Sequence, residues 1–112
     1  MMIQIILLSD KEGLIKEFTV KGHAGYDRPG RDIVCAAVSA VVQTAVIGLT
    51  DVAGINVRHF QQDGFLKCAL PEINNAEEKK AAGLILDTML AGLKSIQMGY
   101  PNLILIKERK VD

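Results

Sequence analysis

The chain has 112 residues, of which 49% are hydrophobic, and thirteen basic residues balance thirteen acidic ones. This length and composition suit one compact domain, so we expect a single domain over residues 1–112. The formal net charge of zero argues against a nucleic-acid binder and gives no reason for attraction to an anionic membrane. Two cysteines are too few for a disulfide framework, which favours free thiols and a cytoplasmic protein.

Two apolar stretches need a check for targeting or membrane insertion. Residues 1–8 lack a basic region and a small-residue cleavage site, so no signal peptide is expected. Residues 33–49 are a little short for a membrane span and include Ser39, Gln43 and Thr44. The sequence therefore predicts a buried core helix there.

The first half of the chain predicts a hairpin and a helix. Residues 3–8 form an apolar run typical of a strand, and the alternation over residues 14–21 predicts a second strand with one buried face. The glycine-rich residues 22–31 follow as an irregular segment. Asp32 is a plausible N-cap for a long apolar helix that ends near Asp51.

The second half predicts another hairpin, a helix and a last strand. Asp63-Gly64 is a strong signal for a two-residue turn. The elements are, in order, strands over 55–61 and 65–70, a helix over 76–98, a short strand over 103–106 and a charged tail over 107–112. We expect an α+β fold in which two β-hairpins and a final strand form a sheet packed with two α-helices, in the order β-β-α-β-β-α-β. The order of the strands within the sheet does not follow from the sequence.

The residues with catalytic chemistry gather between the second strand and the first helix. His23 follows the strand, and Cys35 falls in the first turn of the helix, after the predicted cap Asp32. A helix N-terminus favours a negatively charged thiolate, and a nearby histidine adds an acid–base partner. Unpaired N–H groups of that first turn can also stabilise an oxyanion. One segment thus supplies the nucleophile, the base and the electrophilic stabiliser, with no cofactor and no metal ion.

Helical spacing adds a second observation at this site. Asp32, Cys35, Ser39 and Gln43 recur at steps of three and four, so they share one helix face. On an otherwise apolar helix such a stripe faces either solvent or a functional cavity. Periodicity alone leaves both interpretations open.

Two alternatives involve other residues. Arg28 and Arg31 precede a helix N-terminus and suit an anion or phosphate site, although the spacing matches no dinucleotide or phosphate-loop motif. If Asp63-Gly64 is a two-residue turn, His59 lies opposite Cys68 on the neighbouring strand. That pair lacks a third ligand at zinc spacing, so packing within the hairpin is the favoured interpretation.

The run Gly22-His23-Ala24, followed by the run DIVCAAVS over residues 32–39, resembles Prp, the ribosomal-processing cysteine protease family. The resemblance implies an endopeptidase that removes the short N-terminal extension of a large-subunit ribosomal protein, the twenty-seventh of the bacterial series, after a phenylalanine. It also implies a small α+β sandwich that forms a homodimer. By position it implies that His23 is the base and Cys35 the nucleophile.

The other predicted site residues surround this pair. Asp32 is expected to cap or orient, with Ser39 and Gly22 as further supporting residues. The glycines suit a mobile flap that admits an extended peptide. The predicted flap and substrate-binding residues are Gly25, Tyr26, Arg28, Gly30 and Arg31. The alternative function is a non-catalytic ribosome-assembly module that binds the same peptide.

Overall fold

Alternating apolar residues build the first hairpin, as predicted. Strand β1 (Ile3–Ser9) buries Ile3, Ile5 and Leu7 on one face. Strand β2 (Ile15–Lys21) runs antiparallel to it and places Phe18, which is fully buried, opposite Leu7. Both strands therefore contribute to the same buried face.

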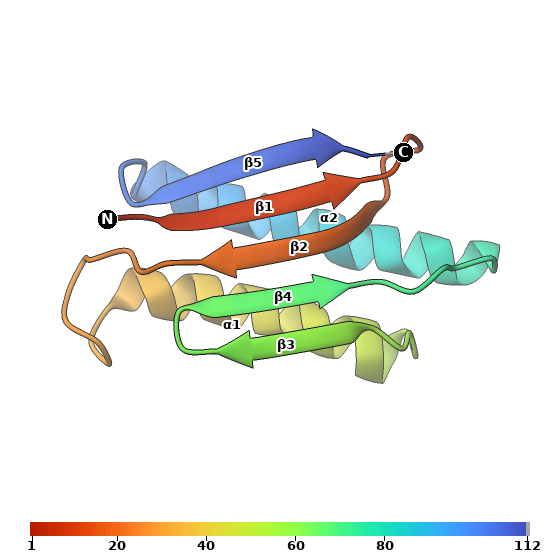
Figure 1. The fold of residues 1–112 in the computed structure, drawn as a ribbon, viewed down its shortest axis with the longest axis horizontal. Helices are drawn as coiled ribbons and strands as arrows, with labels where there is room; N and C mark the ends of the chain where they lie inside the picture. Colours follow the sequence, from red (N-terminus) through yellow and green to blue (C-terminus); the bar gives the residue numbers. More distant parts are fainter. Residues whose placement is uncertain (112) are drawn as a thin grey trace.

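Residues 1–111 are described by the computed structural model, so Asp112, the end of the predicted domain and charged tail, lies outside the described residues. Within them one five-stranded sheet has the order β3-β4-β2-β1-β5 (Figure 1). The remaining strands are β3 (Arg58–Gln62), β4 (Phe65–Ala69) and β5 (Ile104–Lys110). The strand β5 runs parallel to β1, and the other neighbouring strands are antiparallel.

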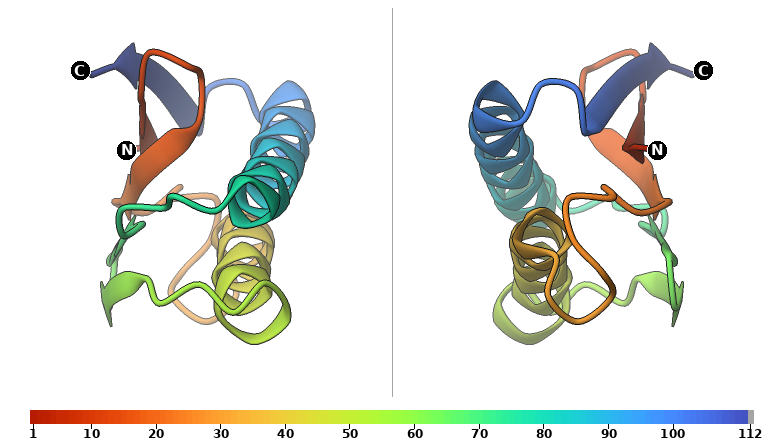
Figure 2. Two further views of the ribbon diagram at one scale, coloured as in Figure 1. Left: turned by 90° about the vertical axis from the view of Figure 1, so that its right-hand side faces the viewer. Right: turned by 90° about the vertical axis from the view of Figure 1, so that its left-hand side faces the viewer.

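Both helices pack on one face of this sheet (Figure 2). Helix α1 (Ile33–Ile47) continues into a π-helical turn, η1 (Gly48–Val52), and α2 (Ala76–Gly99) lies beside it. Leu86 and Leu93 of α2 are fully buried in the core between the layers. The α+β fold of two hairpins, a final strand and two helices is thus confirmed.

The apolar stretch Ile33–Val52 is long and apolar enough to cross a membrane by length and composition alone. Its residues Val34, Val38, Val42 and Leu49 are nonetheless buried in the core of the sandwich. The packing is that of the predicted core helix.

Two predicted strand boundaries were wrong. Residues 55–57 are not part of β3, because the Ile55 N–H donates to the carbonyl of Leu49 at 2.8 Å and so ties this segment to the end of the helix. The last strand does not stop at residue 106. It continues to Lys110 because its charged residues pair with β1, with Arg109 beside Leu8.

Candidate active site

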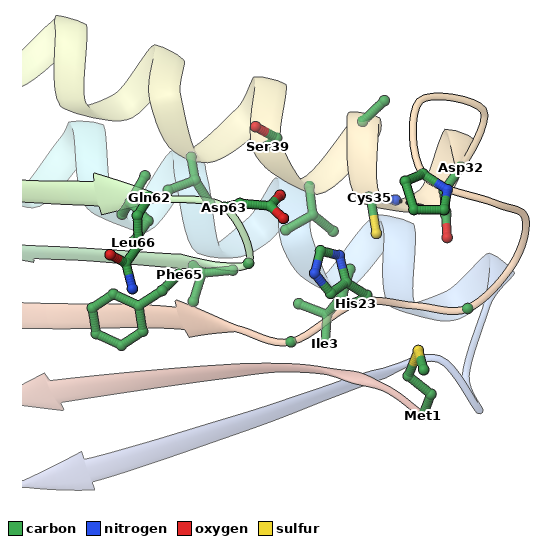
Figure 3. A pocket seen from close by; sticks show the side chains of 18 of the residues that line it. Met1, Ile3, His23, Asp32, Cys35, Ser39, Gln62, Asp63, Phe65 and Leu66 are labelled. Atoms are coloured by element: carbon green, nitrogen blue, oxygen red, sulfur yellow. Dashed lines mark hydrogen bonds between the residues drawn. The ribbon is translucent and has the colours of Figure 1, made fainter.

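Cys35 lies in the first turn of α1, three residues after its N-cap Asp32. Its thiol is partly buried, and its sulfur points toward the side on which His23 lies (Figure 3). In Figure 1 the loop after β2 and the turn between β3 and β4 lie at the same end of the molecule as this helix start.

Asp32 joins the helix start to the preceding loop. Its Oδ1 accepts hydrogen bonds from the N–H groups of Val34 and Cys35, both at 3.0 Å. Its Oδ2 accepts from those of Tyr26 at 3.0 Å and Asp27 at 3.4 Å. Burial would raise the pKa of this carboxyl, but the backbone hydrogen bonds outweigh burial and hold the pKa below its usual value. Asp32 is therefore held as a carboxylate where the loop meets the helix.

The Cys35 sulfur accepts a hydrogen bond from the N–H of Ala24 at 3.3 Å. Burial raises the pKa of the Cys35 thiol, the Ala24 hydrogen bond opposes that effect, and the negative charge of Asp32 raises the pKa further. The net direction is upward. The expectation of a thiolate favoured by the helix N-terminus is thus not met in this arrangement, because the capping carboxylate lies beside the sulfur.

The predicted oxyanion donors are also not free. The N–H groups of Val34 and Cys35 bind the Asp32 carboxylate, and that of Ala36 donates to the Asp32 carbonyl at 3.0 Å. The prediction of unpaired first-turn donors is therefore wrong at these three positions, since the side chain that caps the helix occupies them.

His23 and Cys35 line one cavity of about 780 Å³ between α1, the loop after β2 and the tip of the β3–β4 hairpin (Figure 3). The His23 side chain is exposed. No hydrogen bond joins it to Cys35 among residues 1–111. Its other lining residues include Val20, Gly22, Gly25, Gly30, Asp32, Val38, Ser39, Val42, Asp63, Gly64, Phe65 and Leu66.

The polar stripe of α1 faces this cavity along most of its length. Asp32, Cys35 and Ser39 all line it, and the Gln43 amide donates to the Ser39 hydroxyl at 2.6 Å. Of the two interpretations that periodicity left open, the structure favours the cavity.

Gly22 lies where the chain has no room for a side chain. Its φ is +92°, and a Cβ there would lie 2.7 Å from the Met2 carbonyl oxygen. Its own N–H donates to the carbonyl of Gly64 at 2.9 Å. The backbone just before His23 is therefore fixed between β1 and the hairpin tip.

The predicted flap residues divide into two sets. Gly25 and Gly30 line the cavity, whereas Tyr26, Arg28 and Arg31 are exposed and do not. The ring of Tyr26 packs edge-on against Tyr100, with centroids 5.6 Å apart. The arginines thus do not reach the cavity, which removes the geometric support for an anion site there.

The hairpin tip is part of the site, although no sequence motif indicated it. Asp63, Gly64 and Phe65 line the cavity, although Asp63-Gly64 had been interpreted only as a turn. The signal that could have found them is the strand order, because β4 beside β2 carries this turn to the end of β2.

The second histidine–cysteine pair is placed as predicted, with His59 opposite Cys68 in the register of β3 and β4. Cys68 is fully buried, and burial raises its pKa to about 11. Packing remains the better interpretation. Among residues 1–111, no three histidine, cysteine or acidic side chains gather as a metal site would require.

Comparisons with known proteins agree with this arrangement. The family model described as cysteine protease Prp matches residues 2–105. The ribosomal processing cysteine protease Prp of Bacillus subtilis is 31% identical over 101 residues, covering 88% of this chain and 90% of the relative. That of Staphylococcus aureus is 34% identical over 102 residues, covering 88% and 92%.

A crystal structure of the essential ribosomal processing protease Prp from S. aureus, with a covalently linked product peptide, matches with a TM-score of 0.86. It is 30% identical and covers 96% of this chain and 100% of that one. A second S. aureus structure, with a substrate peptide, matches with a TM-score of 0.81 at 29% identity, covering 96% and 100%. The fold and the thiol-lined cavity are thus those of a cysteine protease. The chain belongs to the ribosomal processing cysteine protease family Prp.

Proposed function

We propose that this chain is the endopeptidase that removes the short N-terminal extension of the twenty-seventh large-subunit ribosomal protein, with Cys35 as nucleophile and His23 as general base. The observation that carries this proposal is that both side chains line one cavity, with the Ala24 N–H directed at the sulfur. The covalently linked product peptide of the S. aureus relative supports chemistry through a covalent intermediate.

Because the pKa of Cys35 is raised, the resting form of the nucleophile is the thiol. His23 takes the Sγ proton as the sulfur attacks the scissile carbonyl carbon, and then gives that proton to the departing amine. The C–N bond breaks and a thioester remains. Water, deprotonated by His23, hydrolyses the thioester and restores the thiol. The imidazole of His23 comes within hydrogen-bond distance of the Cys35 sulfur when a peptide binds. Catalytic hydrogen bonds are often long in unliganded enzymes and shorten in the complex with substrate.

The oxyanion needs a donor other than the occupied N–H groups of the helix start. The N–H of Ala24 already contacts the sulfur. The sulfur becomes a poorer hydrogen-bond acceptor once it has lost its proton to His23 and bonded to the carbonyl carbon. We assign the oxyanion to this N–H, which then moves its hydrogen bond from sulfur to oxygen.

The cavity walls suit an apolar extended peptide. Val38, Val42 and Leu66 lie along it, with Phe65 at the hairpin tip. These side chains favour the apolar-aromatic segment that precedes the cut, because burial of apolar surface drives such binding.

The supporting roles follow from the contacts described above. Asp32 anchors the loop to the helix start, Gly22 allows the close approach of the backbone before His23, and Ser39 offers a hydroxyl in the cavity wall. The flap comprises Gly25, Tyr26, Arg28, Gly30 and Arg31. Tyr26 is its anchored end, and the exposed arginines are its outer part.

The remaining features of this proposal concern the whole protein. Residues 1–112 act as one protease domain in the cytoplasm, where a precursor ribosomal protein is made.

The working form is a homodimer, supported by the large exposed apolar side chains Val52 and Leu84 over the helical layer. Light scattering should give twice the 12.2 kDa of one chain.

The decisive experiment is intact-mass analysis of the ribosomal-protein precursor from the same genome after incubation with the protein. Wild type should release an N-terminal fragment, and Cys35→Ala should release none. Cys68→Ala is the matched control, because it removes the other thiol and should leave cleavage intact. His23→Ala should cost about 100- to 10,000-fold in rate.

Cleavage by folded Cys35→Ala would refute the assignment of Cys35 as the nucleophile. A fully active His23→Ala variant would refute the assignment of His23 as the base. A precursor left intact by reduced, folded wild type would favour the peptide-binding module instead.

A further inference from the structure

The ring of His23 lies against the tip of the β3–β4 hairpin. A Cβ built on Gly64 would lie 2.8 Å from Nε2 of His23, 3.4 Å from Cε1 and 3.6 Å from Cδ2. One edge of the imidazole therefore occupies the space that a side chain at position 64 would need. A separation of 2.8 Å from Nε2 is too short for a real Cβ, so either the ring or the turn would have to move.

A second contact ties the same two segments together. The N–H of Gly22, the residue before His23, donates to the carbonyl of Gly64 at 2.9 Å. Gly64 thus fixes the backbone beside His23 and lies against one edge of the His23 ring. These contacts join residues far apart in the chain, and they exist only because β4 pairs with β2.

No hydrogen bond among residues 1–111 sets the direction of the His23 ring. The side chain is also exposed. An exposed histidine without a polar partner samples several rotamers, so contact with Gly64 restricts the ring by excluding some of them. Proton transfer needs the base within hydrogen-bond reach of the thiol, so this restriction bears directly on the rate.

We propose that Gly64 is a positioning residue for the general base, holding the His23 imidazole on the Cys35 side of the cavity. This inference rests on the proposed function, in which His23 is the base. Gly64 contacts neither the sulfur nor the peptide bond in this scheme. It acts only through the orientation of His23.

Replacement by alanine would have two effects that must be separated. Gly64 has a φ of +73°, so Gly64→Ala strains the turn whatever surrounds it. Gly13, in the β1–β2 turn, has a φ of +91°, and a Cβ there would meet nothing within 4 Å. Gly13→Ala therefore strains a hairpin turn without touching the site, which makes it the matched control.

The first test measures precursor cleavage for wild type, Gly64→Ala and Gly13→Ala. Displacement of a catalytic group by about 1 Å can cost about 100-fold in rate. We expect Gly64→Ala to lose about that much kcat with a smaller change in KM, and Gly13→Ala to stay within about threefold of wild type. Equal activity of the two variants would overturn the proposal.

A double-mutant cycle then asks whether the loss passes through His23. In the His23→Ala background, Gly64→Ala should cause no further drop in the residual rate of precursor cleavage, measured with enzyme in excess. A drop as large as in the wild-type background would overturn the positioning role. If His23→Ala cleaves as fast as wild type, the proposed function fails instead, so the two failures are distinct.

A direct measurement covers the case in which Gly64→Ala does not fold. In the wild-type protein, NMR should show a cross-relaxation signal between the Cε1 proton of His23 and the α protons of Gly64. Absence of that signal would overturn the proposal without any variant or any activity.

Discussion

The raised pKa of Cys35 has a measurable consequence in the free enzyme. Burial and the nearby Asp32 carboxylate both disfavour the thiolate. The rate of alkylation of Cys35 by iodoacetamide should therefore rise with pH through an inflection above the ordinary pKa of a cysteine. Mass spectrometry of the modified protein follows this rate directly.

Cys68 serves as the internal control for that measurement. It is fully buried and its pKa is raised to about 11, so Cys35, which is more accessible, should react much faster near neutral pH. An inflection for Cys35 below neutral pH would contradict the prediction, and would mean that His23 forms an ion pair with the thiolate in solution.

The low pKa of Asp32 predicts a pH-dependent stability. Its pKa in the folded protein lies below its value in the unfolded chain, so its contribution is present above about pH 4 and is lost as the pH falls through the folded value. Asp32→Asn keeps an acceptor for the helix start but loses the Oδ2 bonds to the loop. We expect a cost of about 1–3 kcal/mol in unfolding free energy near neutral pH, and a much smaller cost near pH 2.

Denaturant unfolding of wild type and Asp32→Asn at several pH values measures this difference. A cost independent of pH would show that the carboxylate charge is not involved. The same variant removes the charge beside the sulfur, so its Cys35 alkylation profile should shift to lower pH.

Individual residues at the site were predictable only where their partners are close in sequence. Asp32 and Cys35 are three positions apart, so a helix cap and its spacing were enough to place them. Gly64 lies far from His23 along the chain, and no local pattern indicates that they touch. The effect of the Asp32 charge on the pKa of Cys35 was also not predicted. A capping preference concerns the backbone N–H groups and says nothing about the neighbouring thiol.

At the scale of elements, α2 depends on its N-cap. Asn75 Oδ1 accepts hydrogen bonds from the N–H groups of Glu77 and Glu78 at 2.9 and 3.0 Å. Asn75→Ala should cost about 1 kcal/mol of stability, whereas Asn75→Asp should retain the cap. Thermal unfolding should show a midpoint about 4 °C lower for the alanine variant only.

Asn75 is not among the residues that line the cavity, so cleavage by the alanine variant should match wild type below its unfolding temperature. A loss of activity equal to that of the site variants would contradict this separation. It would show that a loss of stability in α2 reaches the loop that carries His23.

The predicted ends of strands were wrong where tertiary contacts determine them. Residues 107–110 read as a charged tail, but parallel pairing with β1 at the sheet edge extends the strand over them. Charged side chains suit such an edge, because they oppose pairing with another sheet. Residues 55–57 have strand-like composition, but a hydrogen bond to the helix end holds them outside the sheet.

For the whole molecule, the site depends on the order of the strands. The pairing of β2 with β4 joins the two hairpins and brings Gly64 to Gly22. The cavity then lies between α1 and the second hairpin, whereas α2 is not among its walls. Element types and their sequence were predictable from periodicity, but several strand orders bury the same apolar faces, so the order was not.

Because α2 does not line the cavity, a substitution that weakens the core at α2 should lower the stability of the protein without changing its rate of catalysis. Leu86 of α2 is fully buried, so Leu86→Ala should lower the unfolding free energy by about 2–5 kcal/mol. Met98, on the same helix, is 84% exposed, so Met98→Ala should change it by no more than about 0.5 kcal/mol. Denaturant unfolding measures both. While each variant remains folded, its cleavage rate and its Cys35 alkylation rate should equal those of wild type, since neither Leu86 nor Met98 borders the cavity. A slower reaction in folded Leu86→Ala would mean that the two layers transmit strain to His23 and Cys35.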